Sequence, residues 1–263
     1  MIGGAGVALF SSSGLLSREQ FVAELRALLG TDQRIIYTPL GSDTTTSTES
    51  STNGYTVTWD GDISSRLSRL GNGWAQSFNG TSQYGSIPDA AALSFGNGAA
   101  DSGFSAVCVV NATSAAGMRT FLAKSNTANR EYLFGTNGNF LNYGQFDESV
   151  PSGPTRGSNA TITRGIWQAF GSSYTAATGG ATAMNDVTLY ANGASLASTA
   201  FNDAGYVAME NLAAGVTIGA RTAGTAEFYT GSLALAVLVA RALTAAEHAR
   251  IVALSSKYFG LGL

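Results

Sequence analysis

The sequence predicts an all-β fold, an antiparallel β-sandwich with one short helix near the N-terminus and one near the C-terminus. Short stretches of alternating apolar and polar residues recur over residues 74–240 and are separated by clusters of turn-forming residues, as in antiparallel sandwiches. Asn192-Gly193 follows one such stretch and is a strong signal for a tight hairpin. No long helical pattern interrupts this region, which argues against an α/β enzyme fold.

A short amphipathic helix is expected over residues 18–29. Ser17 and Gln20 form a capping box at its start, and Gly30 is typical of a helix end. Apolar side chains recur at helical spacing and form one stripe, made of Phe21, Leu25, Leu28 and Leu29. An isolated helix of about 12 residues is marginal in water, so this stripe must pack either on the body of the same subunit or on a neighbour.

The segment that follows, residues 41–54, consists almost entirely of Ser, Thr and Gly. Such a composition cannot bury a core and predicts a linker or a long exposed loop. Residues 55–59 restore strict alternation, as in a strand. We therefore divide the chain into an N-terminal arm, residues 1–70, with the amphipathic helix and the Ser/Thr-rich linker, and a main β-sandwich domain, residues 71–263.

Within the main domain, two apolar stretches are expected to form central strands. Residues 104–110 alternate so that one face is fully buried, and Cys108 lies there as a small apolar side chain. Residues 233–239 form a longer apolar strand at the centre of the sandwich. Thr244 and Glu247 form a second capping box, which predicts a C-terminal helix that begins at Ala245.

Composition excludes several classes of function. Charged residues make up 12% of the chain and only two are lysines, Lys124 and Lys257, so no basic stripe is present and nucleic acid is not an expected partner. One cysteine and one histidine cannot supply a disulfide or the usual zinc ligands. The sequence has no stretch of about 18 apolar residues, so no membrane span is expected, and the N-terminus lacks the basic residues of a signal peptide.

Four segments then form an ordered set. The first, residues 74–89, has an aromatic residue, an Asn79-Gly80 turn and a closing Pro88-Asp89. A core strand follows at residues 103–107, a hairpin at residues 187–193, and a strand followed by a helix at residues 231–247. This set resembles the laminin G-like branch of the concanavalin A-like jelly rolls over about residues 74–257. The resemblance implies that the β-sandwich of residues 71–263 is a laminin G-like jelly-roll domain, one that binds glycans or protein surfaces, sometimes with calcium.

The residues give little support for a calcium site or for catalysis. Asp60 and Asp62 flank a glycine at calcium-like spacing without the further ligands of a dedicated loop, so they form a turn or, alternatively, a metal site. Glucanases that the fold resembles carry a Glu-x-Asp-x-x-Glu run, which this chain lacks. Asp147 and Glu148 are adjacent and would point to opposite faces of a strand, so they cannot flank a glycosidic bond. We expect a non-enzymatic protein without a cofactor.

The whole chain also resembles virion proteins of tailed bacteriophages, which combine an N-terminal helical segment, a Ser/Thr-rich connector and such a jelly roll. This resemblance implies a structural or accessory protein located in the virion, a capsid decoration subunit or a head or tail appendage. Its partners would be capsid or appendage subunits and, if it self-associates, further copies of the chain. The candidate contact residues are the apolar residues of the arm, Ile2, Val7, Leu9, Phe10, Phe21, Leu25 and Leu28.

The alternative function is a lectin-like carbohydrate-binding adhesion module, free or on a tail, that binds surface glycans. Aromatic faces offer apolar contact to a sugar ring beside polar groups. The candidate residues are Tyr143, Trp167 and Tyr174, although the run around Trp167 favours a place in the core. The two functions are compatible, because a decoration protein can also adhere to glycans.

Overall fold

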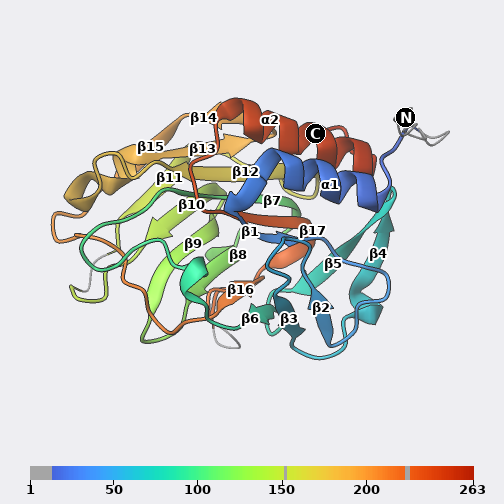
Figure 1. Ribbon diagram of the computed structural model, residues 1–263, viewed down its shortest axis with the longest axis horizontal. Coiled ribbons are helices and arrows are strands. Elements are labelled where there is room, and N and C mark those ends of the chain that lie inside the picture. The colour runs from blue at the N-terminus through green and yellow to red at the C-terminus, as the bar shows by residue number, and fades with distance from the viewer. Residues whose placement is uncertain (1–13, 151–152, 223–225) are drawn as a thin grey trace, which may run out of the picture.

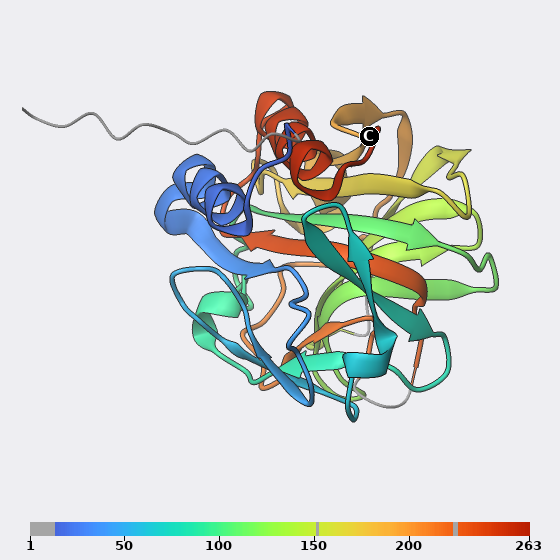
Figure 2. The same cartoon turned by 90° about the vertical axis from the view of Figure 1, so that its right-hand side faces the viewer.

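The computed structural model describes residues 14–150, 153–222 and 226–263. Two antiparallel sheets pack face to face and both α-helices lie on one side of the sandwich (Figure 1, Figure 2). The predicted β-sandwich with an N-terminal and a C-terminal helix is therefore confirmed. Four short 3-10 helices occur in the connections of the described chain, at η1 (Gly30–Asp32), η2 (Ser64–Arg66), η3 (Ala91–Leu93) and η4 (Gly180–Asp186).

Within the described residues, one sheet has eight strands and the other has nine. The eight-stranded sheet runs in the order β14 (Ala194–Leu196), β13 (Val187–Ala191), β12 (Trp167–Tyr174), β7 (Phe104–Ala112), β17 (Thr230–Val239), β5 (Gly73–Asn79) and β4 (Leu67–Leu70), and β1 (Gln33–Tyr37) also pairs with β17. The nine-stranded sheet runs in the order β15 (Ser198–Phe201), β11 (Thr155–Thr161), β10 (Phe140–Gln145), β9 (Arg130–Asn137), β8 (Met118–Ser125), β16 (Val216–Ile218), β6 (Gly85–Ile87), β3 (Thr56–Trp59) and β2 (Thr46–Thr48).

The eight-stranded sheet is buried on both faces. On β7, Phe104 and Cys108 point into the core between the sheets, while Val107 and Val109 point to the opposite face. That opposite face is covered by α1 (Arg18–Leu29) and α2 (Ala245–Phe259). The sandwich therefore has three layers, and the nine-stranded sheet is the one that turns its outer face away from the helices (Figure 2).

Both helices begin with the capping boxes expected from the sequence. The side chain of Ser17 accepts a hydrogen bond from the backbone N–H of Gln20, and that of Thr244 accepts one from Glu247. The apolar stripe of α1 packs on α2 of the same chain, where the ring of Phe21 stacks on Tyr258 at a centroid distance of 4.4 Å. Of the two alternatives for this stripe, the structure shows contact with the body of the same subunit.

Strand β17 lies in the middle of its sheet, as predicted, but its alternation is interrupted. A β-bulge falls between Leu233 and Leu235 in the pairing with β7. Leu233 consequently faces the core, whereas Leu235 and Val237 face the helices. A bulge places two residues opposite one, so the faces of the strand exchange there.

Strands pair across the boundary that the sequence suggested at residue 70. β1 pairs with β17, and β3 pairs with β6, so residues before that boundary contribute strands to both sheets.

The Ser/Thr-rich residues 41–54 are not an exposed linker. They include β2, and within them Glu49 is 3% exposed. Its carboxylate accepts hydrogen bonds from the backbone N–H groups of Ile36, Ser51 and Tyr55. A polar segment can thus be ordered without apolar burial when one carboxylate satisfies several backbone donors.

None of the helices in the described part of the chain is long and apolar enough to cross a membrane.

Candidate functional site

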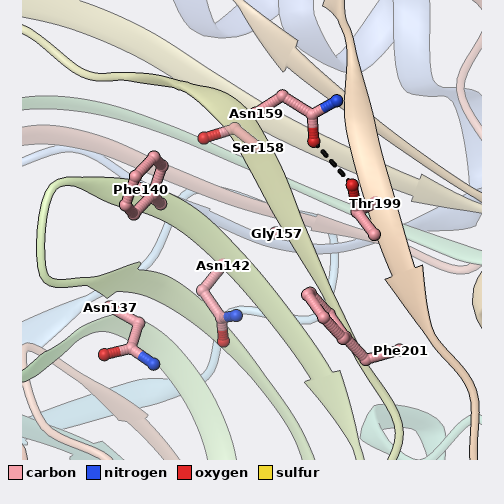
Figure 3. Close-up of a pocket in the computed structure, with 8 residues that line it drawn as sticks. All are labelled: Asn137, Phe140, Asn142, Gly157, Ser158, Asn159, Thr199 and Phe201. Carbon is pink, nitrogen blue, oxygen red and sulfur yellow. Dashed lines mark hydrogen bonds between the residues drawn. The ribbon is translucent and has the colours of Figure 1, made fainter.

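A hollow of about 510 Å³ lies on the outer face of the nine-stranded sheet, over the strands from β9 to β15 (Figure 3). This volume lies within the range of about 300–1,000 Å³ that is usual for small-molecule sites. We call it the aromatic hollow, and it is lined by Asn137, Phe140, Asn142, Gly157, Ser158, Asn159, Thr199 and Phe201.

Strand alternation and register bring the lining together. On β10, Leu141 and Tyr143 point into the core, so Phe140 and Asn142 point outward. Asn142 lies directly opposite Gly157 on β11, which in turn lies opposite Thr199 on β15. The glycine forms the floor of the hollow, because its missing side chain leaves the centre of this row empty.

The floor has room for a side chain. A Cβ atom at Gly157 would come no closer than 3.8 Å to any neighbouring group, the nearest being the ring of Phe201. The space is therefore open to a ligand, and a larger residue at this position would fill it.

Two aromatic rings flank the centre of the hollow. Phe140 is 43% exposed and Phe201 is 59% exposed, and in Figure 3 they lie on either side of Asn142. Two of the four large apolar side chains that are exposed in the described residues thus belong to this one site. Clustered apolar exposure of this kind marks binding surfaces in soluble proteins.

The polar groups of the hollow are amides and hydroxyls. Asn142 is 7% exposed, and its Oδ1 atom has no hydrogen-bond partner. A buried acceptor without a partner costs about 1–3 kcal/mol, so this atom is poised for a donor on a ligand. Asn159 is held in place because its Oδ1 accepts a hydrogen bond of 2.7 Å from Oγ1 of Thr199. None of the lining residues carries a charge.

Two of the predicted sugar-stacking residues are in the core instead. Tyr143 is 1% exposed and Tyr174 is 0% exposed. Their hydroxyls bond within the protein, since that of Tyr143 accepts from Nε2 of Gln145 and that of Tyr174 donates to Asp101. Burial raises the pKa of both phenols well above the ordinary value. Neither ring can stack on a sugar, because both point between the sheets.

The third predicted residue, Trp167, lies on the other sheet. It begins β12 and packs, partly buried, with the apolar cluster under the helices. The structure therefore brings none of the three predicted aromatics to the aromatic hollow. Its own aromatics, Phe140 and Phe201, were missed, although the polar residue Asn142, two positions along the alternating segment, shares the face of Phe140 and signals an outward position.

The predicted partner-contact residues divide into two groups. Phe21 and Leu25 are fully buried within this chain, and Leu28 packs beside them partly buried, so most of the stripe is covered by the chain itself. The helix stripe is satisfied by α2. The remaining candidates, Ile2, Val7, Leu9 and Phe10, lie outside the described residues.

The structure uses Asp60 and Asp62 in a turn. Asp60 accepts hydrogen bonds from Arg66 and from the backbone N–H of Tyr84, and Asp62 accepts one from the N–H of Ser64. Across residues 14–150, 153–222 and 226–263, no group of three or more His, Cys, Asp or Glu side chains is placed to hold a metal ion.

Two buried polar clusters lie away from the aromatic hollow. His248 is 1% exposed, stacks on Tyr190 and has its Nε2 atom 2.8 Å from Oγ of Ser173; burial lowers its pKa to about 4. Lys124 is 0% exposed, and its Nζ donates to Glu131 at 2.6 Å and to Asp89 at 2.8 Å. Burial raises the pKa of Glu131 despite this contact. The dyad of His248 and Ser173 is sealed from solvent, so it offers no nucleophile to a substrate.

No protein-family model matches this chain, and comparison with curated protein sequences finds no relative.

Several solved structures share the fold. The binding domain of Paraclostridial Mosquitocidal Protein 1 is 12% identical with a TM-score of 0.61, over 85% of this chain and 52% of that chain. Domain 4 of AbnA, a GH43 extracellular arabinanase from Geobacillus stearothermophilus solved with arabinotriose, is 16% identical with a TM-score of 0.57, over 84% and 98%. A botulinum neurotoxin type C structure, described by its interaction with two ganglioside molecules, is 10% identical with a TM-score of 0.59, over 87% and 52%.

The chain thus spans about half the length of the two toxin structures and nearly all of the arabinanase domain. At these identities the likeness establishes the β-sandwich fold alone.

Proposed function

We propose that this protein is a carbohydrate-binding domain and that the aromatic hollow is its sugar site. The observation that carries the proposal is the buried, unpartnered carbonyl oxygen of Asn142 between two exposed phenylalanine rings. Two of the structurally similar proteins, the arabinanase domain and the type C neurotoxin, are described with arabinotriose and with gangliosides. They support the class of ligand proposed here.

The chemistry of the hollow suits a sugar. A sugar ring presents apolar C–H groups that pack on an aromatic face and hydroxyl groups that donate and accept hydrogen bonds. Phe140 and Phe201 offer the aromatic faces, and the amides of Asn137 and Asn142 offer the polar contacts. The proposed function is binding alone, and no described group in the hollow can act as a general acid or base.

Calorimetric titration with neutral trisaccharides of arabinan, xylan, cellulose and mannan tests the proposal. We expect one or more of them to bind, and we expect Phe140→Ala and Phe201→Ala to weaken that binding about tenfold or more, since each removes an aromatic contact at the site. Ile166→Ala is the matched control, because Ile166 is 49% exposed and does not line the hollow.

All three variants should keep the melting temperature of the parent protein, because exposed side chains contribute about 0.5 kcal/mol or less to stability. If none of the four sugars binds, or if both phenylalanine variants bind like the parent, the proposal is wrong.

A further inference from the structure

We infer that the same sheet face carries a second sugar subsite and that one glycan chain reaches both. This inference rests on the proposed function of the aromatic hollow. It starts from a second hollow of about 330 Å³ on the nine-stranded sheet, which we call the hydroxyl hollow. Its polar lining consists of Thr58, Ser86, Asp89, Ser125, Asn126 and Thr217.

Strand register shows that both hollows open on one face. Residues that lie directly opposite each other on neighbouring strands point to the same side of a sheet. One unbroken row of such pairs crosses all nine strands, through Thr46, Thr58, Ser86, Thr217, Ala123, Leu133, Gly144, Thr155 and Phe201. Thr58, Ser86 and Thr217 line the hydroxyl hollow, and Phe201 lines the aromatic hollow.

The hydroxyl hollow contains an unsatisfied polar group of its own. Ser125 is 2% exposed, lines the hollow, and its Oγ atom has no hydrogen-bond partner. Beside it lies Asp89, whose side chain is 37% exposed while one of its oxygens is held by the buried ammonium of Lys124. A fixed carboxylate beside hydroxyl groups accepts hydrogen bonds from a ligand with many hydroxyls, as a sugar has.

Between the hollows, the row of residues is apolar and lies under an aromatic ring. Ala123 and Leu133 occupy the row there and are covered by the ring of Phe146. The guanidinium groups of Arg130 and Arg221 lie over this ring, at 4.8 Å and 5.7 Å from its centroid. Each arginine is paired with a glutamate and remains partly exposed, so a sugar chain that crosses this surface meets both hydrogen-bond donors and acceptors.

The spacing of the strands determines how long a ligand must be to reach both hollows. Gly157 on β11 and Ser86 on β6 are separated by five strand spacings in the order of the sheet, which at about 4.8 Å each makes roughly 24 Å. A short oligosaccharide fills only the aromatic hollow, whereas a longer one engages both. Two linked contacts bind about 100-fold or more tightly than one when the linker spans the sites.

Titration of the full chain with trisaccharides and octasaccharides of arabinan, xylan, cellulose and mannan tests the inference. For a series whose trisaccharide binds, we expect the octasaccharide to bind about 100-fold more tightly. Ser86→Leu fills the hydroxyl hollow and should abolish this gain while leaving the dissociation constant of the trisaccharide unchanged. Gly157→Leu fills the aromatic hollow and should weaken both ligands.

Thr46→Leu is the matched control, since Thr46 belongs to the same row but lines neither hollow, and it should change neither constant. If trisaccharides bind but octasaccharides bind no better, or if Ser86→Leu leaves the gain intact, the second subsite is wrong and the proposed function stands. If no series binds at either length, both proposals are overturned.

Discussion

The buried side chain of Asn142 lowers the stability of the folded protein as well as offering an acceptor to a sugar. Its Oδ1 atom is buried without a partner, which destabilises the folded state by about 1–3 kcal/mol when no ligand is bound. Replacing it with leucine, which has a similar size and no polar atoms, should therefore raise the free energy of unfolding by about 1 kcal/mol while reducing sugar affinity. Urea denaturation and calorimetric titration of Asn142→Leu check the two effects. A variant that loses stability and keeps its affinity would show that the carbonyl has a structural partner.

His248 makes stability depend on pH. Burial lowers its folded-state pKa from 6.5 to about 4, so between these values the unfolded chain binds a proton that the folded chain does not. This stability is present above pH 6.5 and is lost as the pH falls towards 4, to a total of about 3 kcal/mol at 1.36 kcal/mol per pKa unit. Urea denaturation at pH 7 and pH 4.5 should show a smaller difference for His248→Gln than for the parent protein. An equal difference in both proteins would mean that folding does not shift the pKa of His248.

At the scale of the elements, α1 and α2 form one layer through aromatic contacts. Phe21 is fully buried against Tyr258 and Phe259. Phe21→Ala should cost about 3–5 kcal/mol, as for other large core truncations, and it should leave sugar binding at 25 °C unchanged in the folded fraction. Thermal unfolding measures the loss. A loss below 1 kcal/mol would indicate that the helix layer is not part of the cooperative fold.

Strands β8 and β9 are linked by the buried pair of Lys124 and Glu131. Removing one partner leaves an uncompensated buried charge, so Lys124→Met should destabilise the protein by about 3–5 kcal/mol. The double variant Lys124→Met/Glu131→Leu should recover much of that loss, because both charges are gone. Urea denaturation of the two variants provides the comparison, and a double variant less stable than the single one would contradict it.

The elements that the sequence predicts well are those with local causes. The capping boxes at Ser17 and Thr244 and the turn at Asn192, where φ is positive, need only neighbouring residues, and all are found. The bulge in β17 depends on register with a distant strand, so no pattern within the strand reveals it. Glu49 shows the same limit, because its donors include Ile36 and Tyr55, which lie outside the segment whose composition predicted a linker or exposed loop.

The site was harder to predict than the fold for the same reason. The aromatic hollow exists because β10, β11 and β15 set Asn142, Gly157 and Thr199 in one row, although these residues lie far apart in the sequence. Choosing aromatics by residue type selected Tyr143, whereas strand alternation sends Tyr143 inward and Phe140 outward. The face on which a residue lies, and not its type alone, decides whether it can meet a ligand.

At the scale of the whole molecule, the proposed binding site and the stabilising helices lie on different layers. The helices cover one sheet (Figure 1). The outer face of the other sheet carries both hollows, and Figure 3 shows the aromatic hollow. A place in a phage particle stays a prediction, since it rests on the resemblance of the sequence alone. Mass spectrometry of purified particles checks it, with a fixed copy number as the expected result.

The most direct test of the sugar site is a map of amide chemical shifts on adding the trisaccharide that binds most tightly. We predict that the largest changes fall on the side-chain amides of Asn137 and Asn142 and on the backbone N–H groups of Gly157 and Thr199, with little change in the helices. Changes centred on the helix layer, or none at saturating sugar, would contradict the assignment of this face as the binding site.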